Sequence, residues 1–381
     1  MSKAERVVVV GGGPAGLSTA AALTRRGIDP LVLDRSERVG ASWAGRYERL
    51  HLHTVRRFSG LAHHGIPKAY ARYISKDEYA EYLGAYADRF ELRLALGEAV
   101  TNVRRGSHWE VETSSRTIVA DVVIVATGHY VEPRVPEWAQ DSAFAGRVLH
   151  SAAYSTGREF AGARALVVGL GNSGAEIATD LVEQGAASVS VAVRTSPPIV
   201  TRELFGVLPV QLFGIALMPL HIPRLVDRVG AVLRTRAVGD LSEYGLAPAA
   251  WGPFTARRPA VIDVGFLEVL KARRVEVRPA VERLTRQGAE FVDGSIAEFD
   301  VVVLATGFGT GLDRVLRDVS GVVSADGQPL TRSGRPTAAP GLYFIGFDET
   351  VRGHLFEARR ESKRLARTVE RSLKSGGTSS A

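Results

Sequence analysis

Two stretches of the chain repeat the same order of apolar strand, glycine-rich turn and helix. RVVVVGGGPAGLSTAAALTRRGIDPLVLDR (6–35) can be laid over ALVVGLGNSGAEIATDLVEQGAASVSVAVR (165–194). A short continuous apolar run bounded by a glycine turn is typical of a parallel strand that is buried on both faces. Each stretch therefore predicts a βαβ unit, with the helix presenting an apolar stripe to the sheet.

The second half of the pattern also occurs twice. RTIVADVVIVATGHY (116–130) parallels GSIAEFDVVVLATGF (294–308), and both read as a short strand, a turn, a buried strand and Ala-Thr-Gly. GLYFIGF (341–347) is one further strand-like run without a glycine turn of its own. The pattern predicts an α/β fold with two Rossmann-like dinucleotide-binding domains, the second inserted into the first.

This organisation gives predicted boundaries for each part of the chain. The first domain comprises residues 1–155 and 310–371, and the second comprises 156–309 with a lid-like insertion at 196–260. The insertion is rich in Pro, Leu and Phe and has no sustained helix or strand period. The tail SLKSGGTSSA (372–381) is small and polar, so we expect it to be disordered.

The first glycine turn has the spacing of a dinucleotide-binding loop. Its glycines allow a tight turn, close approach of a pyrophosphate and close packing of the helix on the strand. Asp34 ends the next strand, where a carboxylate accepts hydrogen bonds from a ribose and repels a 2′-phosphate. This unit therefore favours FAD or NAD. The cofactor-binding residues predicted here are Gly11, Gly13, Pro14, Ala15, Gly16, Asp34 and Arg35.

The second glycine turn has a basic residue where the first unit has its acid. Gly169, Gly171 and Gly174 repeat the turn, and Arg194 followed by Thr195 takes the place of Asp34. A guanidinium binds a phosphate through two parallel hydrogen bonds. The opposite charges predict FAD in the first domain and NADPH in the second, and hence hydride transfer to a flavin.

Composition narrows the chemistry that can follow. The 381 residues include no cysteine, which excludes disulfides, thiolate catalysis and cysteine-ligated metals. Electrons from the flavin must therefore pass to oxygen, a quinone or a protein partner. No histidine or acidic spacing predicts a metal site.

The charge pattern and the apolar segments argue against two other classes of partner. The net charge is +7, but the arginines are scattered, so we expect no nucleic-acid partner. The most apolar segment, 204–220, is short and contains two prolines, so we expect no stable membrane insertion. The N-terminus lacks a signal-peptide pattern, so a cytoplasmic location is expected.

FAGRVLHSAAY (144–154), between the two units, resembles the FxGxxxHxxxY fingerprint of class B flavin monooxygenases. The match falls on Phe144, Gly146, His150 and Tyr154. Segments 43–67, 191–206 and 239–270 are similar to those of the YUCCA-type subgroup, and the resemblance covers about residues 5 to 370. It implies a glutathione-reductase-like fold and an NADPH- and O₂-dependent enzyme that forms a flavin C4a-(hydro)peroxide. Such an enzyme oxygenates a small organic substrate.

The resemblance also implies further cofactor contacts. Trp43 would contact the flavin, Gly40 would allow close approach, and the Val100 backbone would meet the adenine. Asn172 and Ser173 would hold NADPH together with Arg194 and Thr195. The remaining cofactor-binding residues that it implies are Ser42, Thr127 and Gly128.

Two histidines are the predicted catalytic residues. His53 stands where many family members have an asparagine near the reactive edge of the flavin, although the YUCCA-type subgroup also has histidine there. A histidine can also donate a hydrogen bond there. His150 of the fingerprint is interpreted as a positioning residue, with proton transfer or a purely structural role as alternatives.

The reaction itself is left open by the sequence. The apolar insertion favours a hydrophobic or aromatic substrate, with hydroxylation at nitrogen or sulfur or attack on a carbonyl, including a 2-oxo acid. Tyr154 disfavours a dedicated Baeyer–Villiger enzyme, since related enzymes of that type carry tryptophan there, but a Baeyer–Villiger-type monooxygenase stays an alternative. Alternatives are an NADPH oxidase or reductase without substrate oxygenation, and a sensor without turnover. A homodimer is also left open.

Overall fold

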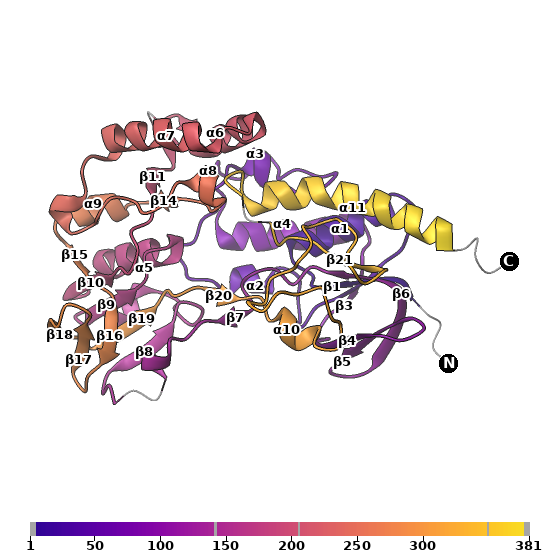
Figure 1. Cartoon of the computed structure of the whole chain (residues 1–381), viewed down its shortest axis with the longest axis horizontal. Coiled ribbons are helices and arrows are strands. Elements are labelled where there is room, and N and C mark those ends of the chain that lie inside the picture. Colours follow the sequence, from indigo (N-terminus) through magenta and orange to yellow (C-terminus); the bar gives the residue numbers. More distant parts are fainter. Residues whose placement is uncertain (1–4, 141–142, 205, 349, 377–381) are drawn as a thin grey trace.

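Two α/β domains lie side by side, with a helical layer above them (Figure 1). The computed structural model describes residues 5–140, 143–204, 206–348 and 350–376. Within these residues, no helix is long and apolar enough to cross a membrane.

The first domain is built on a seven-stranded sheet. Its path runs β3-β2-β1-β6-β5-β4, and β21 pairs with the end of β6. The strands are β1 (Glu5–Val10), β2 (Leu31–Leu33), β3 (Arg93–Ala95), β4 (Val100–Arg105), β5 (Trp109–Thr113), β6 (Thr117–Val125) and β21 (Leu342–Phe344). Strands β3, β2, β1, β6 and β21 are parallel, while β4 and β5 are antiparallel additions.

Helices from both ends of the chain complete this domain. α1 (Pro14–Thr24) packs against α11 (His354–Gly376), and Ser18 Oγ lies 2.9 Å from Ser362 Oγ. α4 (Lys76–Arg89) begins at Ser75 with a capping box, in which Ser75 and Glu78 satisfy each other's backbone N–H groups. Short helices fill the connections: α2 (Ala41–Ala44), α3 (Arg56–Ser59) and α10 (Leu312–Val315).

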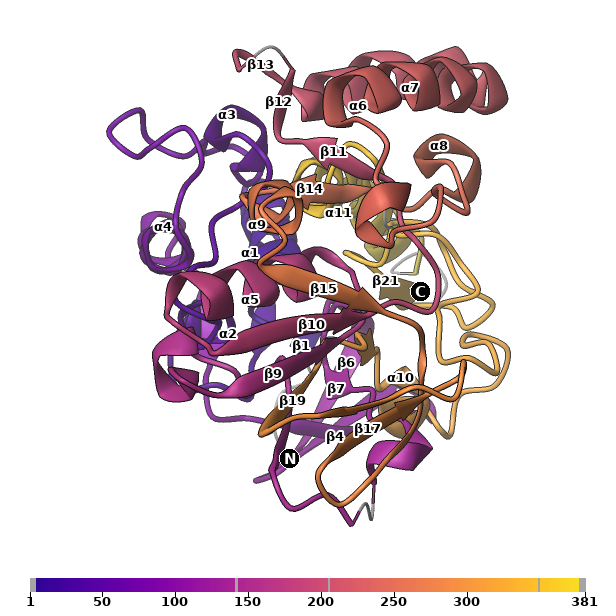
Figure 2. The same ribbon diagram turned by 90° about the vertical axis from the view of Figure 1, so that its left-hand side faces the viewer.

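The second domain has a five-stranded parallel sheet in the order β15-β10-β9-β19-β8. Its strands are β8 (Arg147–His150), β9 (Arg164–Val168), β10 (Ser188–Ala192), β15 (Val275–Arg278) and β19 (Val301–Leu304). α5 (Asn172–Glu183) and α9 (Phe266–Lys271) cover one face. A three-stranded sheet of β16 (Val281–Leu284), β17 (Gly288–Phe291) and β18 (Ile296–Glu298) covers the other (Figure 2).

A short ribbon marks where the chain passes between the domains. β7 (Glu132–Pro133) pairs antiparallel with β20 (Phe308–Gly309). The predicted boundary at residue 155 is therefore wrong, because β8 pairs with β19 inside the second sheet. The chain leaves the second domain through β20, at residues 308–309. Strand β8 has only four residues, so its sequence pattern does not indicate which sheet it joins.

The insertion at 196–260 forms the helical layer. It contains β11 (Ile199–Thr201), β12 (Glu203–Leu204), β13 (Leu208–Pro209), α6 (Val210–Leu217), α7 (Pro223–Val238) and α8 (Pro253–Ala256), and β11 pairs with β14 (Val261–Asp263). α6 rests on the first domain. Gln211 accepts a hydrogen bond from Val55 N–H at 3.1 Å and donates one to Arg352 O at 2.8 Å.

The predicted disordered tail begins too early. α11 continues to Gly376, so residues 372–376 are helical, and residues 377–381 lie outside the described residues. The helix persists because Leu373 packs on the core and Lys374 pairs with Glu370 four residues earlier.

Candidate active site

The first glycine turn leaves an open cradle at the start of α1. Gly11 has φ +109°, and a Cβ there would lie 2.7 Å from Ala126 O. A Cβ on Gly16 would lie 1.8 Å from Gly11 O, so only glycine permits this helix to approach the turn. A Cβ on Gly13 would meet nothing within 4 Å. Backbone N–H groups at this helix N-terminus are therefore open to an anionic group, which fits a pyrophosphate. Pro14 and Ala15 are the first two residues of the helix.

Asp34 is held against the turn by two backbone donors. Its Oδ2 accepts a hydrogen bond from Gly12 N–H at 2.6 Å, and its Oδ1 accepts one from Ser36 N–H at 2.8 Å. A carboxylate has about four acceptor sites, so two remain for ribose hydroxyls. Arg35 beside it is exposed.

The other residues assigned to FAD have more varied surroundings. Trp43 is partly buried and meets the Tyr79 ring edge-on at 4.7 Å. Gly40 has φ +77°, and its Cβ would lie 2.8 Å from Ala80 O, so its close neighbour in the protein is α4. Ser42 is exposed on α2, and Val100 starts β4.

An orphaned polar atom next to this turn supports the fit of a nucleotide. Thr127 Oγ1 is buried and has no hydrogen-bond partner, and the Thr127 Cα would lie 3.2 Å from a Cβ on Gly11. Gly128 follows with φ +78° and open space at its Cβ position. A buried hydroxyl without a partner is costly, so a bound group that supplies one fits this place.

The second glycine turn repeats the geometry of the first. A Cβ on Gly169 would lie 2.7 Å from Ala305 O, a Cβ on Gly174 would lie 2.0 Å from Gly169 O, and Gly171 faces open space. Asn172, at the start of α5, uses its Oδ1 to accept a hydrogen bond from Ile262 N–H at 2.8 Å. The Asn172 side chain thus also holds β14, the strand that follows the insertion.

Arg194 and Thr195 line a cavity of about 440 Å³ at the end of β10. Arg278, from the neighbouring strand β15, lines the same cavity, and its Nε is buried without a hydrogen-bond partner. Two guanidinium groups on one cavity fit a phosphate monoester, such as the 2′-phosphate of NADPH. The sequence singled out Arg194 but not Arg278, because strand pairing is what brings the second arginine there.

His53 is bonded to a carboxylate of the other domain. Its Nε2 lies 2.6 Å from Glu176 Oε1, and Glu176 is 3% exposed on α5. Burial, with the nearby Glu176 charge, raises the pKa of the Tyr47 phenol, which also lies beside Ser173. Sequence reasoning missed Glu176 and Tyr47. The available signal was an acidic residue on the apolar stripe of the helix after a nucleotide turn.

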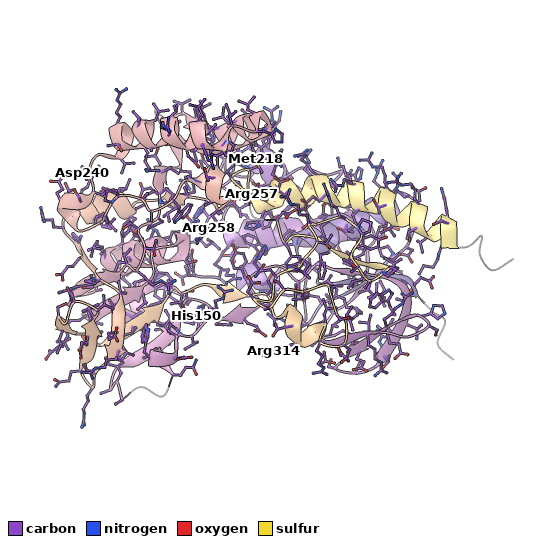
Figure 3. The ribbon with its side chains drawn as sticks, in the orientation of Figure 1. His150, Met218, Asp240, Arg257, Arg258 and Arg314 are labelled. Atoms are coloured by element: carbon purple, nitrogen blue, oxygen red, sulfur yellow. The ribbon has the colours of Figure 1, made fainter. Side chains whose placement is uncertain are left out.

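Both ring nitrogens of His150 are engaged by backbone groups. Nε2 lies 3.0 Å from Gly307 O, and Nδ1 accepts a hydrogen bond from Ala152 N–H at 3.1 Å. Burial lowers the pKa of His150, and the Arg46 charge acts in the same direction. Figure 3 places His150 beside the passage between the domains. This geometry favours the positioning interpretation over proton transfer.

The rest of the fingerprint packs the second domain. Tyr154 donates a hydrogen bond to Asp180 Oδ2 at 2.7 Å, and its side chain is buried. A Cβ on Gly146 would lie 2.4 Å from Asp300 O, so glycine is required for this close approach. Phe144 packs on the cluster at the other face of the second sheet, opposite the one that contains Tyr154. The motif therefore anchors β8 and the segment after it.

Arg46 is a partly buried cation whose neighbours are aromatic rings. Its guanidinium carbon lies 5.3 Å from the centre of the Phe308 ring and 5.7 Å from that of Tyr130. Among the residues that the structure describes, no carboxylate lies within 4.0 Å of it. Burial lowers the pKa of Arg46. The sequence analysis did not single this residue out.

Two acidic residues, Asp348 and Glu361, lie close together near the N-terminus of α1, and the sequence analysis did not predict this pair. Burial, together with the nearby Asp348 carboxylate, raises the pKa of Glu361 well above its usual range, and Glu361 Oε2 is buried without a hydrogen-bond partner. The loop that contains Asp348 approaches α1 closely, since a Cβ on Gly346 would lie 2.7 Å from Ala15 Cβ. The two residues come from separate segments that no local pattern connects. No group of three or more metal-ligating side chains occurs within the described residues.

Known proteins are similar in sequence to most of this chain. Residues 8–203 match the pyridine nucleotide-disulphide oxidoreductase family. The indole-3-pyruvate monooxygenase YUCCA1 of Oryza sativa subsp. japonica is 37% identical, over 91% of this chain and 87% of its own. The probable indole-3-pyruvate monooxygenase YUCCA9 of Arabidopsis thaliana is 36% identical, over 89% and 83%. The chain belongs to the YUCCA-type flavin monooxygenases.

Solved structures agree with this membership. A flavin monooxygenase from Stenotrophomonas maltophilia, in a double-mutant form, has a TM-score of 0.76 and 26% identity, covering 97% of this chain and 99% of that one. The OTEMO complex with FAD and NADP has a TM-score of 0.77 at 20% identity, covering 99% and 86%, and supports the fold alone. The predicted fold class and family are thus confirmed. This YUCCA-type monooxygenase is an FAD- and NADPH-dependent oxidoreductase that oxygenates a small molecule with O₂.

Proposed function

We propose that the substrate is a 2-oxo acid with an aromatic or hydrophobic side chain, and that oxygenation removes its carboxylate as CO₂. The relatives named indole-3-pyruvate monooxygenases support this substrate class. The observation that carries the proposal is Arg46, a partly buried guanidinium that has aromatic neighbours and no carboxylate partner among the described residues.

Arg46 has the chemistry to bind the substrate carboxylate. A guanidinium pairs with a carboxylate through two parallel hydrogen bonds, which fix orientation as well as adding affinity. Burial lowers the pKa of Arg46 because it disfavours the charged guanidinium. A bound carboxylate would stabilise that charge. The Phe308 and Tyr130 rings beside it provide apolar surface for the substrate side chain.

The position of Arg46 also suits this role. Its backbone N–H bonds to Trp43 O at 3.0 Å, next to the residue assigned to the flavin, and its charge acts on His150 at the domain passage. Arg46 thus lies between the two nucleotide units.

The reaction balances without a further reactant. One 2-oxo acid, O₂, NADPH and a proton give a carboxylic acid that is one carbon shorter, CO₂, NADP⁺ and water. When bound, NADPH supplies the hydride and FAD passes the electrons to O₂. We assign to the residues of this chain the binding of substrate by Arg46, the fixing of His53 by Glu176, and the fixing of the domain passage by His150.

Replacing Arg46 with Ala tests the assignment. We expect kcat/KM for a 3-aryl-2-oxo acid to fall roughly 10- to 100-fold, since a hydrogen bond to a charged group contributes about 1.5–3 kcal/mol. The KM for NADPH and the FAD content should stay unchanged. Binding of the methyl ester of the same acid should be affected little, because the ester has no charge to pair.

A matched control is Arg158→Ala, which removes an exposed arginine that pairs with Glu48. It should leave kcat/KM within about twofold, because exposed ion pairs contribute little. If Arg46→Ala raised the KM for NADPH instead, or left turnover of the 2-oxo acid intact, Arg46 would not be the carboxylate site.

A further inference from the structure

Exposed apolar side chains are concentrated in the helical layer. Of the 13 large hydrophobic residues that are exposed among the described residues, eight lie between 207 and 233. These eight are Val207, Leu208, Leu220, Ile222, Leu225, Val229, Val232 and Leu233. Such a concentration on one short segment indicates an interaction surface rather than scattered surface residues.

Four of them form a stripe along α7. Leu225, Val229, Val232 and Leu233 are 54%, 51%, 52% and 51% exposed. Their spacing of four, three and one residues puts them on one face of the helix. We call these four residues the α7 stripe.

The opposite face of α7 holds the helix to the protein. Asp227 accepts hydrogen bonds from the backbone N–H groups of Phe254 and Thr255, at 2.9 and 2.7 Å. Val238 is buried. The α7 stripe therefore points away from the domains, and α7 lies in the outermost layer in both ribbon views (Figures 1 and 2).

The charges on this helix are basic on its outer side. α7 contains four arginines and one aspartate, and the aspartate is the inward-facing Asp227. Arg224, Arg228 and Arg236 are exposed. An apolar stripe next to exposed arginines is the pattern of helices that lie in the surface of an anionic bilayer.

We propose that α7 docks this enzyme reversibly on an anionic lipid surface, with the α7 stripe in the interface and the three arginines against the headgroups. A second copy of the chain fits this face less well. A twofold symmetric contact would bring the same arginines of both copies together without acids to neutralise them. This inference is independent of the proposed substrate.

Vesicle co-sedimentation of the FAD-loaded full chain tests the proposal. We expect it to sediment with vesicles of equal parts phosphatidylglycerol and phosphatidylcholine, and not with pure phosphatidylcholine. The triple variant Arg224→Gln, Arg228→Gln, Arg236→Gln should lose about 100-fold in partitioning, at about fivefold per arginine near an anionic leaflet. The variant Leu225→Gln, Val229→Gln, Leu233→Gln should lose binding even at low salt.

The control variant is Val292→Gln with Ile296→Gln, which removes two exposed apolar residues next to β17 and in β18, in the small sheet that covers the face of the second domain opposite α5 and α9. It should bind vesicles like the parent. All variants should keep their FAD and their circular dichroism spectrum. Absence of the parent from the vesicle pellet would overturn the proposal, as would unchanged binding of the stripe variant. A concentration-dependent dimer in sedimentation velocity that the stripe variant abolishes would assign the face to a second copy.

Discussion

Single side chains join the two nucleotide-binding domains at the candidate active site. His53 belongs to the first domain and Glu176 to the second, and the 2.6 Å contact between them is partly buried. Glu176 is buried and His53 is partly buried, so the loss of either side chain leaves the other without its polar partner. The contact therefore ties the orientation of a predicted active-site histidine to the helix that begins at the NADPH turn.

This pairing predicts a measurable coupling. His53→Leu and Glu176→Leu should each lower the free energy of unfolding by about 1–3 kcal/mol, because each leaves a buried polar group unsatisfied. The double variant should lose less free energy of unfolding than the sum of the two single losses, and the difference should be about 0.5–3 kcal/mol. Urea denaturation of the four proteins measures this. His53→Leu should also lower the ratio of product formed to NADPH consumed.

The neighbouring His51 provides the control. Its side chain is exposed and its Nδ1 lies 2.9 Å from Arg49 O, so His51→Leu should change the free energy of unfolding by no more than about 0.5 kcal/mol. Additive effects of the two main substitutions would argue against the contact. An unchanged ratio of product to NADPH in His53→Leu would remove the histidine from the active site.

For most of these contacts, the sequence predicts one of the two residues but not its partner. Arg194 could be selected because the repeated unit fixes its place relative to a glycine turn, and His53 and His150 because the segments around them resemble those of a known family. Arg46 and Arg278 could not be selected, because their roles come from contacts between segments that are distant in the chain. For Glu176 the helix pattern offered a signal, but its contact with His53 could not be inferred. Motif spacing reports local geometry and says nothing about which strand or helix becomes a neighbour.

Whole elements were predicted more completely than single contacts. Both βαβ units form as expected, since apolar runs before glycine turns determine buried parallel strands. The glycines that the pattern requires have the backbone geometry that needs them, as Gly11 at φ +109° and Gly169 at φ +100° illustrate. The boundary at residue 155 failed because a four-residue strand such as β8 carries too short a pattern to indicate its sheet.

The end of strand β10 carries a prediction about cofactor choice. Arg194→Ala should raise the KM for NADPH roughly 10- to 100-fold and leave that for NADH nearly unchanged, because only NADPH carries a 2′-phosphate. Initial rates with each nucleotide measure this. Arg283→Ala is the control, since that arginine pairs with Glu290 on a different strand pair. Equal effects on both nucleotides would refute a phosphate-binding role for Arg194.

At the scale of the molecule, the second domain is connected to the first only through β7 and β20 along the chain. These two strands are paired, with Phe308 opposite Pro133 and Gly309 opposite Glu132. The two connections therefore start and end at the same place. This arrangement makes each domain a separate unit of the backbone, although α6 and Glu176 still contact the first domain across space.

Removing residues 134–307 tests this independence. An Asn-Gly turn that joins Pro133 to Phe308 would close a hairpin with the existing pairing. The shortened protein should fold and remain yellow with bound FAD, but NADPH should not reduce it. Absorbance of the flavin during anaerobic addition of NADPH measures this, with the full-length protein as the reference. A soluble but colourless product would mean that FAD binding needs both domains.

The pairing of α1 with α11 has a consequence for how the protein is made. Ser18 and Ser362 touch across 344 positions of the chain, and β21 joins the first sheet from beyond the second domain. During synthesis the second domain leaves the ribosome as a continuous segment and can fold first. The first domain cannot complete its fold until β21 and α11 have been synthesised, so its early strands stay exposed until then. We therefore expect FAD to bind late, after α11 has been synthesised and the first domain has folded.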